Sequence, residues 1–131
     1  MALLIDTDLL IDRERLGADS AIENRLGDED RAISVITVSE LLHGVRRARG
    51  EVQMRRRAFV EHLLAGFEAV PITETVARIH AEVWAEMAAR GEPIGAHDLW
   101  IAATALAHGF GVATGNASEF RRVPGLRVVA P

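Results

Sequence analysis

The sequence contains no cysteine and no lysine, and each absence excludes a class of chemistry. Without cysteine, the chain has no disulfides, no thiolate nucleophile and no zinc ribbon. Without lysine, a P-loop is excluded, because that loop needs a lysine to reach the phosphates of a nucleotide. All 15 basic residues are arginine, and the net charge is −4. An acidic chain of this kind does not coat nucleic acid through a generally basic surface, although it can carry a local basic patch.

Long apolar runs and a visible leader segment are missing as well. No apolar stretch approaches the ~20 residues that cross a bilayer. The segment from Met1 to Ile5 lacks the basic stretch and small-residue cleavage site of a secretory signal. We therefore expect no membrane association and a cytoplasmic location. With 131 residues, of which 49% are hydrophobic and 26% charged, residues 1–131 are predicted to form a single globular domain.

Short apolar runs alternate with segments of helical spacing along the chain. The runs predicted to be buried strands are Ala2–Ile5, Ala32–Ile36, Phe67–Ile72, Gly111–Ala113 and Leu126–Val129. The predicted helices are Val38–Arg49, Glu51–Ala65, Thr73–Arg90 and Ala96–His108. This alternation predicts an α/β domain in which helices cover both faces of a mainly parallel sheet. In open sheets of this kind, ligands bind beyond the carboxyl ends of the strands.

Four polar residues are predicted to meet at that end of the sheet. Asp6 follows the first predicted strand directly, and Glu40 lies four residues past the second. Asp98 opens the last long helix, and Asn116 follows the fourth strand. Each also has an ordinary structural explanation: a capping box with Thr37 as cap and Glu40 reaching back, first-turn acids that interact with a helix dipole, and an asparagine after a glycine in a turn.

Taken together, three carboxylates in one cleft favour a metal site. Asp6, Glu40 and Asp98 would repel one another unless a cation lay among them. Hard oxygen ligands that converge from separate segments are what a Mg2+-dependent phosphodiester hydrolase needs. In such a reaction Asp6 or Asp98 would bind the metal and accept a proton, and the hydroxyls of Thr7 and Thr114 could position a water or a phosphate oxygen. Ordinary turn and cap chemistry is the alternative for both threonines.

Four segments of the chain carry a familiar pattern in a familiar order. They are Ile5-Asp6-Thr7, Ser39-Glu40-Leu41-Leu42-His43-Gly44, the run from Pro93 to Ala105 around Asp98, and Thr114-Gly115-Asn116 with Phe120 downstream. These segments resemble the successive motifs of PIN-domain ribonuclease toxins of the VapC type. The resemblance covers essentially the whole chain, and the Asp98 segment is its most specific part. It implies a PIN-like α/β/α sandwich with a mainly parallel five-stranded sheet and an acidic pocket that binds Mg2+ or Mn2+.

The same resemblance assigns roles to individual residues and implies partners. Asp6, Glu40 and Asp98 match the three acidic positions of the pocket, with Asp6 and Asp98 as metal ligands. Asn116 falls where many relatives carry a fourth acid, and Glu119, three residues on, is a candidate to compensate. The implied function is that of a Mg2+-dependent endoribonuclease, the toxin of a toxin-antitoxin pair. A small VapB-type antitoxin that inserts a tail into the pocket and a homodimer are implied in the same way.

Six arginines around Gly50 form a candidate RNA-binding segment. They are Arg46, Arg47, Arg49, Arg55, Arg56 and Arg57. Guanidinium groups bind phosphates bidentately and stack on bases, whereas a solvated helical surface is the alternative. Trp84 and Trp100 lie within apolar helical patterns and are predicted to be core or subunit-interface residues.

Two other functions are compatible with parts of the sequence. Asp6-Thr7-Asp8 resembles the Asp-x-Asp of haloacid-dehalogenase-type phosphatases, but these enzymes and response-regulator receivers usually rely on a downstream lysine, which this chain lacks. A catalytically silent module that uses the PIN-like fold only to assemble complexes is the second alternative, and Asn116 keeps it open. Metal-dependent RNA cleavage that is abolished by chelation would distinguish an enzyme from such a module.

Overall fold

A five-stranded sheet with every pair of neighbouring strands parallel forms the centre of the computed structural model, which describes residues 2–16, 27 and 29–130, with only the backbone for residues 12–16. The strands are β1 (Leu3–Ile5), β2 (Arg31–Ser34), β3 (Glu68–Val70), β4 (Gly111–Ala113) and β5 (Val128–Val129). The helices are α1 (Thr7–Leu16), α3 (Val35–Arg47), α4 (Gly50–Ala65), α5 (Glu74–Ala89), α6 (Ala96–His108) and α7 (Ala117–Phe120). The predicted α/β class is confirmed.

The strand order places a crevice beside β1. The order is β3-β2-β1-β4-β5, so β2 and β3 lie on one side of β1, and β4 and β5 lie on its other side. The connections from β1 and from β4 therefore leave toward opposite faces of the sheet, and a crevice opens between them at the carboxyl ends of the strands. Asp6 follows β1 and Thr114 follows β4, so both lie at this switch point.

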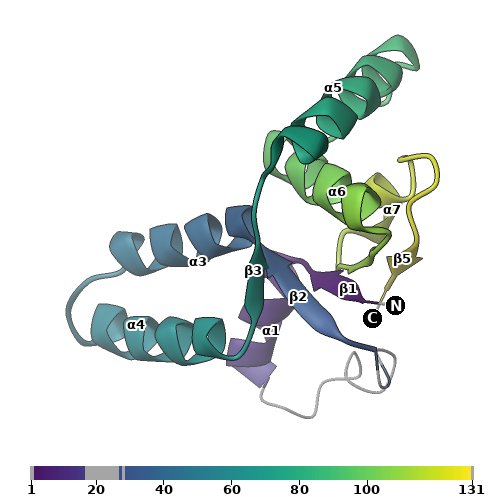
Figure 1. Cartoon of the computed structure of the whole chain (residues 1–131). Helices are drawn as coiled ribbons and strands as arrows, with labels where there is room; N and C mark the ends of the chain where they lie inside the picture. The colour runs from purple at the N-terminus through teal and green to yellow at the C-terminus, as the bar shows by residue number, and fades with distance from the viewer. Residues whose placement is uncertain (1, 17–26, 28, 131) are drawn as a thin grey trace.

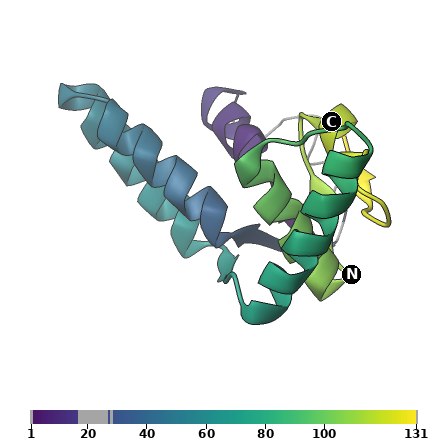
Figure 2. The same ribbon diagram turned by 90° about the horizontal axis from the view of Figure 1, so that it is seen from above.

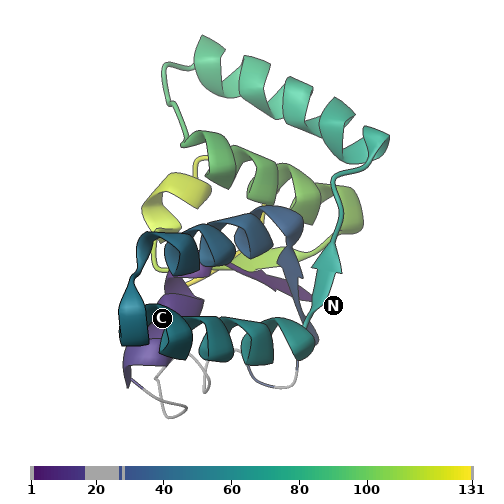
Figure 3. The same ribbon diagram turned by 90° about the vertical axis from the view of Figure 1, so that its left-hand side faces the viewer.

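Two apolar layers enclose the sheet, one on each face (Figures 1 and 3). Leu3 and Ile5 point to the face covered by α1, α3 and α4, whereas Leu4 between them points to the face covered by α6 and α7, with α5 packed on the outside of α6. Side chains alternate along a strand, so these consecutive apolar residues fill both layers. α5 packs on α6 rather than on the sheet, which leaves its outer surface exposed (Figure 1).

Helices α3 and α4 form a hairpin that projects away from the sheet (Figure 2). The hairpin turns at Gly50, whose φ of +60 lies in the left-handed region that favours glycine. The Gln53 side chain donates hydrogen bonds to the carbonyls of Val45 and Ala48, at 3.2 and 2.9 Å. The Val45 carbonyl also accepts from the Ala48 backbone nitrogen at 3.2 Å. Gln53 adds a second donor there and ties the start of α4 to the end of α3.

The second predicted strand extends too far, because Val35 and Ile36 belong to α3. Ser34 caps this helix, and its Oγ accepts a hydrogen bond from the Ile36 backbone nitrogen at 3.0 Å. Such a cap satisfies a free amide of the first turn, which outweighs the preference of β-branched residues for strands. The predicted capping box is therefore wrong: Thr37 lies inside α3 and is fully buried, and Glu40 lies further along the helix.

Other boundaries differ from the predictions by one or a few residues. β3 and β5 are shorter than predicted, because Phe67, Pro71, Ile72, Leu126 and Arg127 lie outside the ladders. Thr73 is the cap of α5 and not its first residue, since its Oγ1 accepts from the Val76 nitrogen. Helices α1 and α7 are additional to the predicted elements. Among the described residues, no helix is both long and apolar enough to cross a membrane.

Candidate active site

Asp6 is a buried carboxylate held on both of its oxygens. Its side chain is 5% exposed, where β1 ends and α1 begins. Oδ1 accepts a hydrogen bond from the Thr7 backbone nitrogen at 2.8 Å, and Oδ2 accepts one from the Thr114 hydroxyl at 2.7 Å. Thr114 in turn accepts a hydrogen bond from the Asn116 nitrogen at 2.9 Å. Asp6 stands directly before α1, where an acid can interact with the helix dipole. It also belongs to a cluster of side chains from the ends of two neighbouring strands, β1 and β4.

Asp98 lies in the first turn of α6 and faces the loop after β4. The cap of this helix is Gly95, so Asp98 is not the cap residue. The Asn116 amide donates to Asp98 Oδ2 at 3.4 Å and to Glu119 Oε2 at 2.6 Å. Glu119 also accepts a hydrogen bond from the Gly95 backbone nitrogen through its other oxygen. Asn116 thus links two carboxylates, a role that the turn explanation does not account for.

Glu40 joins the cluster from α3. Its Oε1 accepts a hydrogen bond from the Thr7 hydroxyl at 2.9 Å, and the Thr7 and Thr37 hydroxyl oxygens lie 3.2 Å apart. Oε2 of Glu40 lies 3.6 Å from Nδ1 of His97, whose ring is largely exposed. The structure therefore brings together all four predicted polar residues and both predicted threonines, and it adds His97 at the edge of the cluster.

Asp8 also belongs to the cluster. In the sequence it was a candidate only for the phosphatase alternative. Both of its carboxylate oxygens lie within hydrogen-bond distance of the Gly115 backbone nitrogen, at 3.3 and 3.1 Å. A Cβ at Gly115 would lie 2.7 Å from Asp8 Oδ2, so a side chain there would displace the Asp8 carboxylate from its present position. The signal in the sequence is the second acid of Asp6-Thr7-Asp8, which stands in the first turn of α1.

Burial and mutual repulsion raise the pKa values of two of these acids. Burial raises the pKa of Asp6 from 3.8 to about 7; the Thr114 hydrogen bond opposes the rise, and the charges of Asp8 and Asp98 add to it. Burial also raises the pKa of Asp98 to about 6, with a further contribution from the charges of Glu119, Glu40 and Asp8. Both carboxylates would be ionised more readily if a cation lay beside them.

The donor set fits a hard divalent cation that keeps part of its water shell. In the described part of the chain, no three Asp, Glu or His side chains gather closely enough to form a ready-made metal cage. Mg2+ does not require one, because it retains several waters and binds through one or two carboxylates plus substrate phosphates. Asp6 and Asp98 supply such oxygens; burial raises the pKa of each, neighbouring acids add to the rise, and a cation beside them would favour the ionised form.

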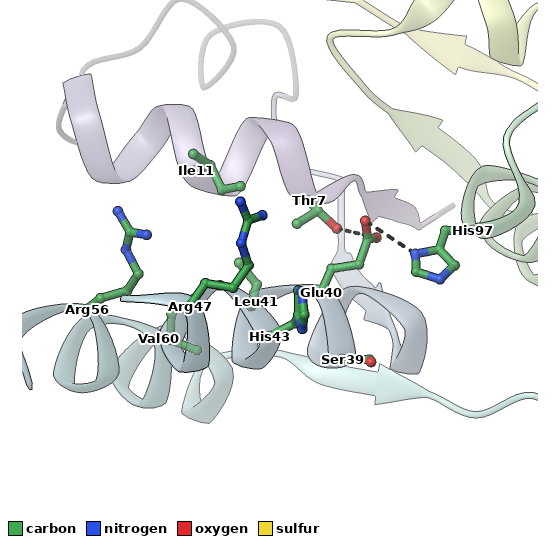
Figure 4. A pocket seen from close by; sticks show the side chains of 11 residues that line it. Thr7, Ile11, Ser39, Glu40, Leu41, His43, Arg47, Arg56, Val60 and His97 are labelled. Atoms are coloured by element: carbon green, nitrogen blue, oxygen red, sulfur yellow. Dashed lines mark hydrogen bonds and ion pairs between the residues drawn. The ribbon is translucent and has the colours of Figure 1, made fainter. Parts of the chain in front are cut away.

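A cavity of about 500 Å³ adjoins the Glu40 side of the cluster (Figure 4). It lies between α1 and the α3–α4 hairpin, and Glu40 and His97 line one part of it. Of the six predicted RNA-binding arginines, only Arg47 and Arg56 line this cavity. The other four are exposed elsewhere on the hairpin; they are Arg46, Arg49, Arg55 and Arg57.

The tryptophans belong to α5 and α6, on the layer across the sheet from the α3–α4 hairpin. Trp100 is half-buried and stacks on His80 with ring centroids 3.6 Å apart. Trp84 is 63% exposed, so the prediction of a core position is wrong for Trp84 and the interface prediction is the one compatible with its exposure. Its exposure follows from the packing of α5 on α6, which turns the outer side of α5 away from the sheet.

Comparison with known proteins identifies similar chains along the whole sequence. The family model described as the PIN domain matches residues 3–126. The chain is 33% identical to Ribonuclease VapC1 of Rickettsia felis over 130 residues, which cover 98% of this chain and 96% of that protein. It is 37% identical over 97 residues to the tRNA(fMet)-specific endonuclease VapC of Salmonella typhimurium, covering 73% of this chain and 71% of that protein.

A solved structure agrees with this similarity. The crystal structure of DNA-bound VapBC from Salmonella typhimurium contains a chain that matches 99% of this one over 98% of its own length. The TM-score is 0.89, and the sequence identity is 29%. A match of this extent includes all five strands in their order, together with the hairpin that follows β2.

Proposed function

The chain belongs to the PIN-domain family, and from this premise we propose that it is a Mg2+-dependent endoribonuclease, the toxin of a toxin-antitoxin pair. Its similarity to proteins named ribonuclease VapC supports the reaction class, and the matched structure of a VapBC complex supports the pairing with an antitoxin. The observation that carries the proposal is the convergence of Asp6 and Asp98 in one cluster, where burial and neighbouring acids raise the pKa of both.

Asp6 and Asp98 are the residues that would hold the cation, with Mn2+ as an alternative to Mg2+. When bound, the ion would stabilise charge on the attacked phosphate and lower the pKa of a water molecule. Thr114 and the Thr7 amide orient the Asp6 carboxylate through their hydrogen bonds. Glu40 is oriented by the Thr7 hydroxyl on the side that faces the cavity, where it is placed to accept a proton from an attacking water.

Glu119 supplies a further carboxylate beside Asp98, so the uncharged Asn116 does not leave the site short of acids. The charge of Glu119 is the largest contribution from a neighbouring acid to the raised pKa of Asp98. Asn116 bridges the two acids by donating to both. We propose that Asn116 positions these acids, whereas Glu119 contributes the negative charge that attracts the cation.

The test is RNA cleavage by the purified protein. Cleavage of single-stranded RNA should occur with Mg2+ or Mn2+ and stop in EDTA. Asp98→Asn should reduce the rate by orders of magnitude, because the lost charge no longer holds the metal. Glu74→Gln removes one carboxylate from an exposed ion pair on α5 and serves as the matched control. Full activity in excess EDTA would refute metal dependence, and no cleavage under any condition would favour the silent binding module.

Two partners follow from the same proposal. We propose that a VapB-type antitoxin inserts a tail into the acidic cluster, where a basic side chain can replace the cation as the counter-charge. We also propose that the protein forms a homodimer. The exposed apolar residues Val52 and Met54 on α4 and Trp84 on α5 are available for such contacts. Size measurement of the free protein and of its complex with antitoxin tests both assignments.

A further inference from the structure

The cavity between α1 and the α3–α4 hairpin has one acidic part and one basic part. Glu40, Gly44 and Arg47 follow one another along α3 at the spacing that places residues on one face of a helix. Arg56 reaches the same space from α4, and Figure 4 shows both arginine side chains directed toward α1. Seven residues of α-helix span roughly 10 Å. The Cα atoms of Glu40 and Arg47 are therefore about two helical turns apart, with the acid toward one end of the cavity and the arginines toward the other.

Apolar side chains from three helices complete the walls. Ile11 of α1, Leu41 of α3 and Val60 of α4 line the cavity. A strand of RNA has the matching composition, because its backbone carries phosphates whereas its riboses and bases offer flat, weakly polar surfaces. The cavity thus combines cationic groups with apolar surface beside the acidic cluster.

Gly44 leaves a space that the fold itself does not need. It lies in the interior of α3, where glycine is among the least favourable residues. Its φ is not positive, so the backbone does not require glycine. A Cβ at this position would meet no atom within 4 Å, so packing does not require glycine either. Because Gly44 lines the cavity, the absent side chain widens the passage between Glu40 and Arg47.

We propose that this cavity is the binding cleft for single-stranded RNA beside the scissile bond, with Arg47 and Arg56 holding a backbone phosphate and Gly44 leaving room for the strand. The inference rests on the proposed ribonuclease function and names the substrate path to that site. Guanidinium groups bind phosphate in a bidentate manner. The cleft adjoins the acidic cluster directly, since Thr7, which lines the cleft, donates through its hydroxyl to Glu40 at 2.9 Å and through its backbone nitrogen to Asp6 at 2.8 Å. This continuity favours substrate RNA over an acidic protein segment as the occupant.

Binding of a fluorescent single-stranded RNA oligonucleotide in EDTA tests the arginines without cleavage. Arg47→Gln and Arg56→Gln should each weaken binding about tenfold and lower the slope of log K against log salt by about 0.7, the contribution of one phosphate contact on a single strand. Arg78→Gln, on the opposite layer, is the matched control and should leave both quantities unchanged. Effects of equal size from Arg46→Gln and Arg57→Gln would overturn the proposal, because these residues do not line the cleft.

Substitution of Gly44 tests the space. Gly44→Ala should raise the Tm, because it improves helix propensity and its Cβ meets no atom within 4 Å. Gly44→Leu also improves helix propensity and extends a larger side chain from the wall of the cavity. RNA affinity should fall with the size of the new side chain. Ala58→Leu, at an exposed position of α4, adds the same bulk outside the cleft and should not change it. Unchanged RNA affinity in a folded Gly44→Leu would overturn the proposal, and so would loss of folding in both Gly44 variants, since the space would then be structural.

The two hypotheses fail in different ways. If wild-type protein neither binds nor cleaves the RNA, the proposed ribonuclease function is wrong. If wild type cleaves RNA with Mg2+ but the Arg47, Arg56 and Gly44 variants cleave equally well at limiting RNA, only the cleft is wrong. Poly-glutamate that binds wild type and requires Arg47 and Arg56, combined with RNA binding that does not require them, would assign the cleft to an acidic protein segment instead.

Discussion

Replacement of Asp6 by asparagine should make the metal-free protein more stable at neutral and basic pH. Asp6 is almost fully buried, with Oδ1 on the Thr7 amide and Oδ2 on the Thr114 hydroxyl. Asparagine has nearly the same shape, and its Oδ1 can still accept from the Thr7 amide. The Thr114 hydroxyl, which donates to Asp6 in wild type, must turn and accept from the asparagine Nδ2. Asp6→Asn therefore removes the charge, keeps the contact with Thr7 and reverses the hydrogen bond with Thr114.

The magnitude follows from the pKa of Asp6, which burial raises from 3.8 to about 7. Between these two values the folded protein holds a proton that the unfolded chain releases, so the free energy of unfolding falls as pH rises. The stabilisation is fully present below pH 3.8 and is lost as the pH passes through about 7. Since one pKa unit corresponds to 1.36 kcal/mol, the loss in wild type is at most about 4 kcal/mol. Asp6→Asn does not undergo this loss.

Urea unfolding in EDTA from about pH 4 to about pH 8 measures the effect. The difference in unfolding free energy between Asp6→Asn and wild type should increase steadily with pH and level off near pH 8. A smaller slope should remain in the variant, because burial also raises the pKa of Asp98. Parallel curves for the two proteins across this range would refute the reasoning, since Asp6 would then have the same pKa in the folded and unfolded states.

Addition of Mg2+ at the basic end of this range gives a second, independent result. Binding to the folded state should stabilise wild type by roughly 2.7 kcal/mol at a hundredfold excess over Kd. Asp6→Asn should gain much less, because one of the two proposed ligand charges is missing. Equal stabilisation of both proteins by Mg2+ would remove Asp6 from the metal site.

Three further substitutions test other contacts. Gly115→Ala places a Cβ 2.7 Å from Asp8 Oδ2, so Asp8 must move; RNA cleavage and the urea midpoint should both fall, and a variant with wild-type values would show that this approach is not needed. Gln53→Ala removes two hydrogen bonds to carbonyls at the end of α3 and should lower the unfolding free energy by about 1 kcal/mol. A larger loss together with altered cleavage would indicate that the whole hairpin moves. Asn116→Asp adds a negative charge beside Asp98 and Glu119, so it should lower the Tm in EDTA. It should also lower the Kd for Mg2+ measured by calorimetry. An unchanged Kd would place this side chain away from the cation.

The elements that could be predicted are those whose signals are local. The helix Ala96–His108 and the strand Gly111–Ala113 have the predicted boundaries, because the helical segment is apolar through most of its length and Gly109, with a φ of +67, ends the helix. The predicted start of α3 was wrong, since the choice between strand and helix for Val35 and Ile36 depends on one hydrogen bond to Ser34. Composition and periodicity do not report such a bond.

The convergence of the site was predictable from topology alone. Asp6, Glu40 and Asn116 come after parallel strands, whose carboxyl ends lie at one edge of the sheet. Asp98 opens the helix that leads back into β4, so its first turn is expected at the same edge. All four could therefore be grouped from the sequence. Their partners could not. The pairing of Thr7 with Glu40 and of Thr114 with Asp6 depends on the distances between β1, α3 and β4.

The sequence by itself determined the fold class, the position of the polar residues at the strand ends and the absence of thiol and lysine chemistry. These properties depend on residue type and spacing along the chain. Only the tertiary structure decided which acids are buried, that Asp8 and Glu119 belong to the cluster, and which two of six arginines face the cleft. Burial and charge coupling depend on how helices from distant segments pack together, and local sequence patterns carry little information about that packing.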